Sequence, residues 1–247
     1  MPVSLTTFYG MAAFVALLIG FAKGGFGGTL GVLATPLLAL IMPANEVIGL
    51  LLPLLILADV FAVVSYWQEW DWKLILLLIP GAVAGVTVGT LFILNAPTEA
   101  LKLALGVIIL VFAGYKIFET RLFRSTAYQA RDWHGMLAGV LAGLFSALAH
   151  TGGPPIGIYL ILRRVPIRVF NATTALFFAL LNWIKVPYYL YAGLFDFQRL
   201  WSLVGLLPLL PLGVWLGKQL ADRISPEVFE RSIVILLIVT ALLLILT

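Results

Sequence analysis

The sequence contains no cysteine and little charge: 11% of its 247 residues are charged, whereas 62% are hydrophobic. The absence of cysteine excludes disulfides, thiolate nucleophiles and cysteine metal sites, so packing has to hold the fold together. Soluble domains are about 25% charged and about 45–50% apolar. A water-soluble core cannot hide this much apolar surface, so we predict an all-α polytopic membrane protein that lies in a lipid bilayer.

Several functional motifs are also missing. The sequence has no basic tail, no RNA-binding motif, no HExxH and no cluster of acidic metal ligands, so we expect no nucleic-acid partner, no metal and no cofactor. The apolar opening, residues 1–22, lacks a positively charged start, and the apolar run resumes directly after Lys23. We therefore interpret it as a membrane helix rather than a cleaved signal.

Polar breaks divide the chain into two halves of five apolar segments each. A first membrane repeat, residues 1–118, and a second, residues 134–247, flank a polar linker at 119–133. The expected helices are 4–22, 29–42, 47–67, 74–94, 99–117, 135–149, 154–162, 169–192, 199–217 and 228–246.

The two halves resemble each other. GGFGGTLGVLATP aligns with HTGGPPIGIYLIL, Pro80 with Pro208, and NAP at 95–97 with ISP at 224–226. A glycine- and proline-interrupted pair of short segments in each half is typical of secondary transporters built from repeats.

Segment 154–162 is too short to span a bilayer. Its nine residues reach roughly 14 Å as a helix, about half of the hydrocarbon core. We therefore predict that 135–149 and 154–162 form a re-entrant, broken helical hairpin, and that 4–22 and 29–42 form another. Each repeat then consists of a hairpin followed by three transmembrane helices.

Positive charge predicts the orientation of these elements. Lys and Arg gather in the linker and at the exit of the second hairpin, where Arg163, Arg164 and Arg168 lie, so both face the cytoplasm. The first hairpin has Glu46 at its end and enters from outside. The odd number of crossings per half makes the repeats inverted, with both termini outside, in the periplasm.

The two hairpin tips predict a site for a small anion. Non-helical backbone at membrane depth has to be buried in protein or line a polar cavity, and a new helix starts at each tip. Tight helix packing by the glycines is the alternative. The predicted substrate-binding residues are Lys23, Gly24, Gly25, Gly27, Gly28, Thr29, His150, Thr151, Gly152, Gly153 and Asn182.

Three ionisable residues are candidates for proton coupling or for a structural charge. Asp59 lies at mid-span, and the repeat aligns it with Asn182; it either pairs with a lysine or takes up protons. Lys185 lies one turn from Asn182 and either escorts an anion or reaches the interface beside Tyr188, Tyr189 and Tyr191. His150 could carry a proton or donate a hydrogen bond.

Two stretches resemble the TauE/SafE (TSUP) family of sulfite and organosulfonate permeases. They are GFAKGGFGGTLGVLATPLLAL in the first half and GLFSALAHTGGPPIGIYLIL in the second, and the segment spacing agrees over essentially the whole chain. The resemblance implies export of a small sulfur-containing anion, sulfite or an organosulfonate, across the bacterial inner membrane. The His150-Thr151 pair departs from the plain glycine run that the family often has at this tip.

Three questions stay open at the level of sequence. A passive anion channel would share the site of a carrier coupled to protons or voltage. An intramembrane hydrolase is a further alternative, because Ser146 precedes His150 by one helical turn. The sequence is also compatible with a homo-oligomer.

Overall fold

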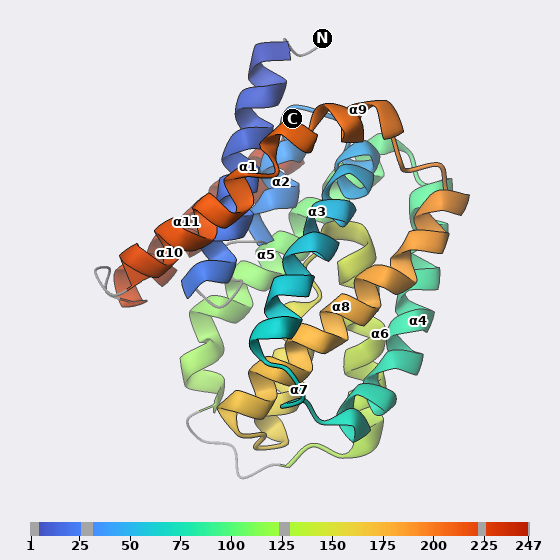
Figure 1. The fold of residues 1–247 in the computed structure, drawn as a ribbon. Coiled ribbons are helices and arrows are strands. Elements are labelled where there is room, and N and C mark those ends of the chain that lie inside the picture. The colour runs from blue at the N-terminus through green and yellow to red at the C-terminus, as the bar shows by residue number, and fades with distance from the viewer. Residues whose placement is uncertain (1–4, 26–31, 124–128, 222–225, 247) are drawn as a thin grey trace. The chain divides into compact units, whose positions relative to one another are not determined.

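The computed structural model describes residues 5–25, 32–123, 129–221 and 226–246 (Figure 1). The chain divides into two compact units. The first unit comprises Met1–Ala58, Pro97–Ala113 and Gly193–Thr247, and the second comprises Asp59–Ala96 and Gly114–Ala192. Each unit therefore combines segments from both halves of the sequence, and each is described by itself below.

All regular secondary structure in the described residues is helical. The helices are α1 (Leu5–Gly25), α2 (Ala34–Ala39), α3 (Ala44–Ser65), α4 (Trp72–Asn95), α5 (Thr98–Phe123), α6 (Asp132–Ala149), α7 (Gly153–Leu162), α8 (Ile167–Tyr191), α9 (Phe197–Ser202), the 3₁₀ turn η2 (Val204–Leu206), α10 (Leu209–Ala221) and α11 (Pro226–Leu246). The all-α class predicted from composition is confirmed.

Five of these helices are long and apolar enough to cross a membrane. They are α3, α4, α6, α8 and the Thr98–Ile117 part of α5. The segment from Phe197 to Gly217 adds a sixth if its two parts, which meet at a bend of 51°, form one span. Within the described part of the chain, these helices support a multi-pass membrane protein.

Two of the expected helices differ from the prediction. The single helix expected at 199–217 is broken at Pro208, which has no N–H and whose ring would clash with the carbonyl of Val204 in a continuous helix. The helix expected at 29–42 ends at Ala39, and Leu40 and Ile41 form a turn before Pro43. Its expected start at Thr29 lies outside the described residues.

Helices α6 and α7 form the hairpin predicted in the second half. The chain ends of the hairpin meet, because Ala130 N donates to Leu162 O at 3.3 Å and Arg163 Nη1 donates to Asp132 Oδ1 at 2.9 Å. The segment therefore leaves on the side where it enters, as the short length of 154–162 predicted.

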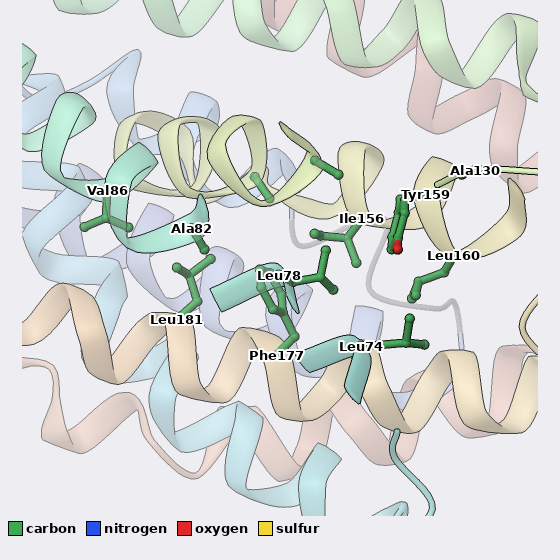
Figure 2. Close-up of a cluster of buried hydrophobic side chains, with 12 residues drawn as sticks. Leu74, Leu78, Ala82, Val86, Ala130, Ile156, Tyr159, Leu160, Phe177 and Leu181 are labelled. Atoms are coloured by element: carbon green, nitrogen blue, oxygen red, sulfur yellow. The ribbon is translucent and has the colours of Figure 1, made fainter. Parts of the chain in front are cut away.

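The core of the second unit packs this hairpin against two long helices (Figure 2). Leu78 and Ala82 of α4 lie beside Ile156 of α7 and beside Phe177 and Leu181 of α8, all of them buried. The apolar cluster holds α7 in place from its first turn to its end.

Glycines join α4 to α6 in the second unit. A side chain on Gly85 would collide with the carbonyl of Val140, and one on Gly143 would collide with the carbonyl of Ala82. Helix backbones come this close where both carry small residues, as membrane helices commonly do. The contact fixes the depth and rotation of α6, and hence the place of its last residue.

Helices α1 and α10 of the first unit are joined in the same way. Gly20 lies against the carbonyl of Leu210, and Gly213 lies against the carbonyl of Leu17. Each residue of α1 here precedes its α6 counterpart by 123 positions, and each residue of α4 precedes its α10 counterpart by 128. The two halves thus repeat one set of interhelical contacts, whereas their inverted orientation stays a prediction.

Candidate functional site

Helix α6 ends at His150 in a left-handed conformation, with φ of 55°. Its N–H donates to Ser146 O at 3.1 Å, and Thr151 N donates to Phe145 O at 3.3 Å. This is the end at which helices favour glycine, and a residue with a Cβ is held there at a cost of about 1–2 kcal/mol. An unfavourable backbone kept at a helix break points to a use for the imidazole.

The start of α7 offers few backbone N–H donors. Helix α7 begins at Gly153, so Pro154 and Pro155 occupy its next two positions. Proline fits a first turn well but has no N–H. Two of the four free N–H groups of an ordinary helix start are therefore missing, and an anion at this tip depends more on side chains.

Lys185 of α8 is buried beneath the tip, with 0% of its surface exposed. Its Nζ lies 2.9 Å from His150 Nδ1, 3.0 Å from Ser146 Oγ and 3.3 Å from Ser146 O. Lys185 Nζ donates to both oxygens of Ser146, and the ring nitrogen of His150 lies within hydrogen-bond distance of it. The alternative that Lys185 reaches the membrane interface is wrong, because protein atoms enclose it.

Tyr189, one turn beyond Lys185, completes the same face of α8. Its hydroxyl donates to Ala147 O at 2.8 Å, and its ring centroid lies 5.9 Å from Lys185 Nζ and 6.4 Å from the His150 ring centroid. Tyr189 is buried, so it belongs to the site rather than to an interfacial belt. Tyr191, by contrast, is exposed.

Asn182 and Asp59 meet one turn on the other side of Lys185. Asn182 Nδ2 donates to Asp59 Oδ2 at 2.5 Å, and both residues are buried. The two residues are 123 positions apart, the same offset that relates α1 to α6. Residues equivalent by a two-fold repeat contact each other only near its axis, which supports the internal alignment.

The structure thus brings some predicted residues together and leaves others undescribed. His150 contacts Lys185, Asn182 contacts Asp59, and Thr151, Gly152 and Gly153 follow at the break between α6 and α7. Lys23, Gly24 and Gly25 belong to the last turn of α1, but their surroundings are not described. Gly27, Gly28 and Thr29 lie outside the described residues, so the first half of the predicted site stays a prediction.

The sequence suggested other roles for two residues of the site than the structure shows. Ser146 drew attention as a nucleophile and Tyr189 as an interfacial aromatic, yet both are structural neighbours of Lys185 and His150. The available signal was a matched spacing: Ser146 and His150 on α6, and Lys185 and Tyr189 on α8, are each four residues apart and share a helix face. Among the described residues, no group of three acidic, cysteine or histidine side chains could hold a metal.

The architecture defines a polytopic helical membrane protein with a buried cation under a re-entrant tip. Residues 12–244 match the family model of the sulfite exporter TauE/SafE, so the chain belongs to that family, as the two glycine-rich stretches predicted. Neither a search of curated proteins nor a search of solved structures gave a match. Membership identifies a membrane transporter of a sulfur-containing anion.

Proposed function

We propose that this protein is a secondary transporter that exports sulfite, or a small organosulfonate, across the bacterial inner membrane. It works by alternating access and is coupled to protons or to voltage. The observation that carries the proposal is the contact of the buried Lys185 with His150 at the broken hairpin. An intramembrane cation is costly in lipid, and such residues commonly mark a pathway for charged substrates.

The tip is suited to an oxyanion rather than to a cation. Lys185 supplies positive charge below the break, and His150 and Thr151 supply polar side chains at it. Asp59 accepts a hydrogen bond from Asn182 one turn away. The polar side chains at the tip itself are therefore those of a lysine, a histidine and a threonine, which can donate to the oxygens of an anion.

Alternating access is supported by the repeated helix contacts. Both hairpins carry a close glycine contact to a helix from the other half of the sequence, at equivalent positions. A duplicated architecture has two nearly equivalent packings, which can open one site first to one side and then to the other. The repeats are inverted and both termini lie in the periplasm, as the gathering of Lys and Arg in the linker and at the exit of the second hairpin supports.

Efflux from liposomes tests the proposed substrate. Purified protein is reconstituted into vesicles loaded with sulfite at alkaline pH, where little neutral sulfur dioxide leaks. We expect sulfite efflux well above that of protein-free vesicles and above the efflux of sulfate. Equal rates of sulfite efflux from vesicles with the protein and from protein-free vesicles would overturn sulfite as the substrate. Organosulfonates would then be the next substrates to test.

A carrier and a passive channel differ in exchange kinetics. Sulfite on the outside should accelerate efflux of labelled sulfite through a carrier, because the loaded site returns faster than the empty one. A channel has no such step, so external sulfite should either leave the efflux rate unchanged or reduce it. Acceleration in the reconstituted protein is the result that we expect.

The hydrolase alternative has one observation in its favour, the 3.0 Å contact of Ser146 Oγ with Lys185 Nζ. Serine and lysine form a nucleophile and base in some hydrolases. Here, however, Lys185 also contacts His150 and donates to the carbonyl of Ser146, and Ser146 is buried. If the protein is a transporter, the Ser146→Ala variant should retain substantial sulfite efflux. If it were a hydrolase with Ser146 as its nucleophile, this variant would lose all hydrolytic activity.

A further inference from the structure

The last turn of α6 has backbone carbonyls that its own helix does not satisfy. The chain departs from helical geometry at His150. Thr151 N would bond Ala147 O in a continuous helix, but it donates to Phe145 O instead. Ser146 and Ala147 are both buried, so their carbonyls lie away from bulk water. A buried carbonyl without a partner is costly, so the end of α6 needs donors from elsewhere in the fold.

Two side chains of α8 supply these donors. Lys185 Nζ donates to Ser146 O at 3.3 Å, and the Tyr189 hydroxyl donates to Ala147 O at 2.8 Å. Lys185 and Tyr189 are four residues apart and share one face of α8, and they meet consecutive carbonyls of α6. The positive charge of the lysine is also favourable at this place, because the aligned backbone dipoles leave negative partial charge at a helix C-terminus.

The same two contacts bridge a weak point of α8. Pro187 lies between Lys185 and Tyr189 and has no N–H, so the hydrogen-bond ladder of α8 is interrupted there. With one contact on either side of the proline, the end of α6 holds both parts of α8 in a fixed relation. The Tyr189 ring contributes as well, because its centroid lies 5.9 Å from Lys185 Nζ, within the range of a cation–π interaction.

We propose that Lys185 and Tyr189 together cap the end of α6, and that Tyr189 is a positioning residue for the transported anion. Its hydroxyl keeps the last turn of α6 on α8, so that the Lys185 ammonium stays beneath the tip when it also attracts the anion. This inference rests on the proposed function, in which the anion binds at this tip. Tyr189 then acts through Lys185 and not by contact with the substrate.

The residue next to Tyr189 provides a matched control. Tyr188 Oη lies 2.9 Å from Thr87 Oγ1 of α4, and the hydrogen of that threonine is donated to Val83 O. The Tyr188 hydroxyl is therefore the donor in this contact. Tyr188→Phe and Tyr189→Phe each keep the ring and remove a hydroxyl that joins α8 to another helix. Of the two variants, only Tyr189→Phe alters the end of α6.

Amide hydrogen exchange in nanodiscs tests the cap without any transport assay. The N–H groups of His150 and Thr151 are bonded only while the last turn of α6 is formed, so their exchange reports its opening. For the loss of one hydrogen bond, we expect Tyr189→Phe to speed exchange in a peptide covering 146–153 by about 2- to 12-fold. Tyr188→Phe should leave this exchange unchanged. Unchanged exchange in Tyr189→Phe, or equal acceleration by both variants, would overturn the cap.

A second pair of variants tests the other donor. Lys185→Met removes the charge and the N–H groups from the cap, so exchange in the same peptide should again be faster. Lys73→Met, which removes an exposed lysine of α4, should leave it unchanged. Exchange at the wild-type rate in Lys185→Met would contradict a cap formed by both residues.

The dependence of efflux on the internal sulfite concentration then tests the positioning role. A variant that only folds less well has a lower maximal rate and an unchanged KM, because fewer molecules are active and each of them is normal. We expect Tyr189→Phe to raise KM by about 2- to 12-fold, and Tyr188→Phe to keep the KM of the wild type. An unchanged KM in Tyr189→Phe would overturn the positioning role, whatever its maximal rate.

The exchange and efflux experiments can fail independently. A wild-type protein without sulfite efflux overturns the proposed substrate, and hydrogen exchange still decides whether α8 caps α6. Conversely, sulfite efflux by the wild type together with unchanged exchange in Tyr189→Phe preserves the proposed function and overturns the cap.

Discussion

The α1/α10 pair of the first unit and the α6/α4 pair of the second make equivalent contacts, yet the cation of each half comes from a different helix. The offset of 123 residues aligns Lys23 on α1 with Ser146 on α6. Lys185 on α8 aligns with Ala62 on α3 and contacts Ser146. The two lysines thus lie at positions that the internal alignment does not relate to each other.

The two units also contain one ion pair each between equivalent helix ends, with the signs exchanged. In the first unit Glu46 at the start of α3 pairs with Arg199 of α9. In the second, Arg168 at the start of α8 pairs with Glu69, just before α4. In the predicted topology, the two residues of each pair lie on the same side of the membrane. Arg168, at the exit of the second hairpin, lies on the side predicted to be cytoplasmic.

The largest effect should come from removing either lysine. Hydrogen bonds to a charged group contribute about 1.5–3 kcal/mol, so Lys185→Met should slow sulfite efflux by about 10- to 150-fold or more. We predict the same for Lys23→Met, and the double variant should be little worse than either single one if both serve one site. Additive losses would indicate two independent roles.

The glycine contacts can be tested as a matched set. Gly143→Ala and Gly20→Ala place a methyl group against a backbone carbonyl, and overpacking of this kind costs about 1–3 kcal/mol. Both should lower the thermal midpoint in detergent by similar amounts. Gly114→Ala in α5 is the control, because no atom lies within 4 Å of the added methyl group. A lowered thermal midpoint for only one of these two variants would contradict the equivalence of the α1/α10 and α6/α4 contacts.

Exchanging Asp59 and Asn182 tests the contact between equivalent positions. Asn182→Asp sets two carboxyl groups together in a buried place and should destabilise the fold by about 1–3 kcal/mol. The double variant Asp59→Asn with Asn182→Asp should recover most of this loss in a thermal melt. Asp59→Asn alone distinguishes the roles of the carboxylate: lost folding indicates a structural pair, and a folded protein with altered pH dependence of efflux indicates proton coupling.

The smallest effect concerns the exposed pair of Glu69 and Arg168. Hydrogen bonding by Arg168 lowers the pKa of Glu69 below its ordinary value. The folded pKa is thus below the unfolded one, so the pair stabilises above the unfolded pKa and this contribution is lost as pH falls through the folded pKa. Arg168→Gln should lower the thermal midpoint slightly at about pH 7 and by less at about pH 3. An equal shift at both values would exclude the carboxylate as the cause.

Local sequence signals predicted much of this architecture. Apolar runs located most helices, the nine residues of 154–162 predicted the hairpin, and the repeat aligned Asp59 with Asn182. The enclosure of Lys185 by Ser146 and His150 could not be predicted, because it depends on how α8 rotates against α6, which packing over several helices determines. The break at Pro208 was missed because apolarity alone does not distinguish a continuous helix from a bent one.

The most direct test of the account compares sulfite efflux from liposomes containing the wild type, Lys185→Met or Lys73→Met. The account predicts rapid sulfite efflux for the wild type and Lys73→Met, slow sulfate efflux for both, and sulfite efflux near the protein-free level for Lys185→Met. Undiminished sulfite efflux by a folded Lys185→Met protein would contradict the claim that the buried cation beneath the second tip forms the anion site.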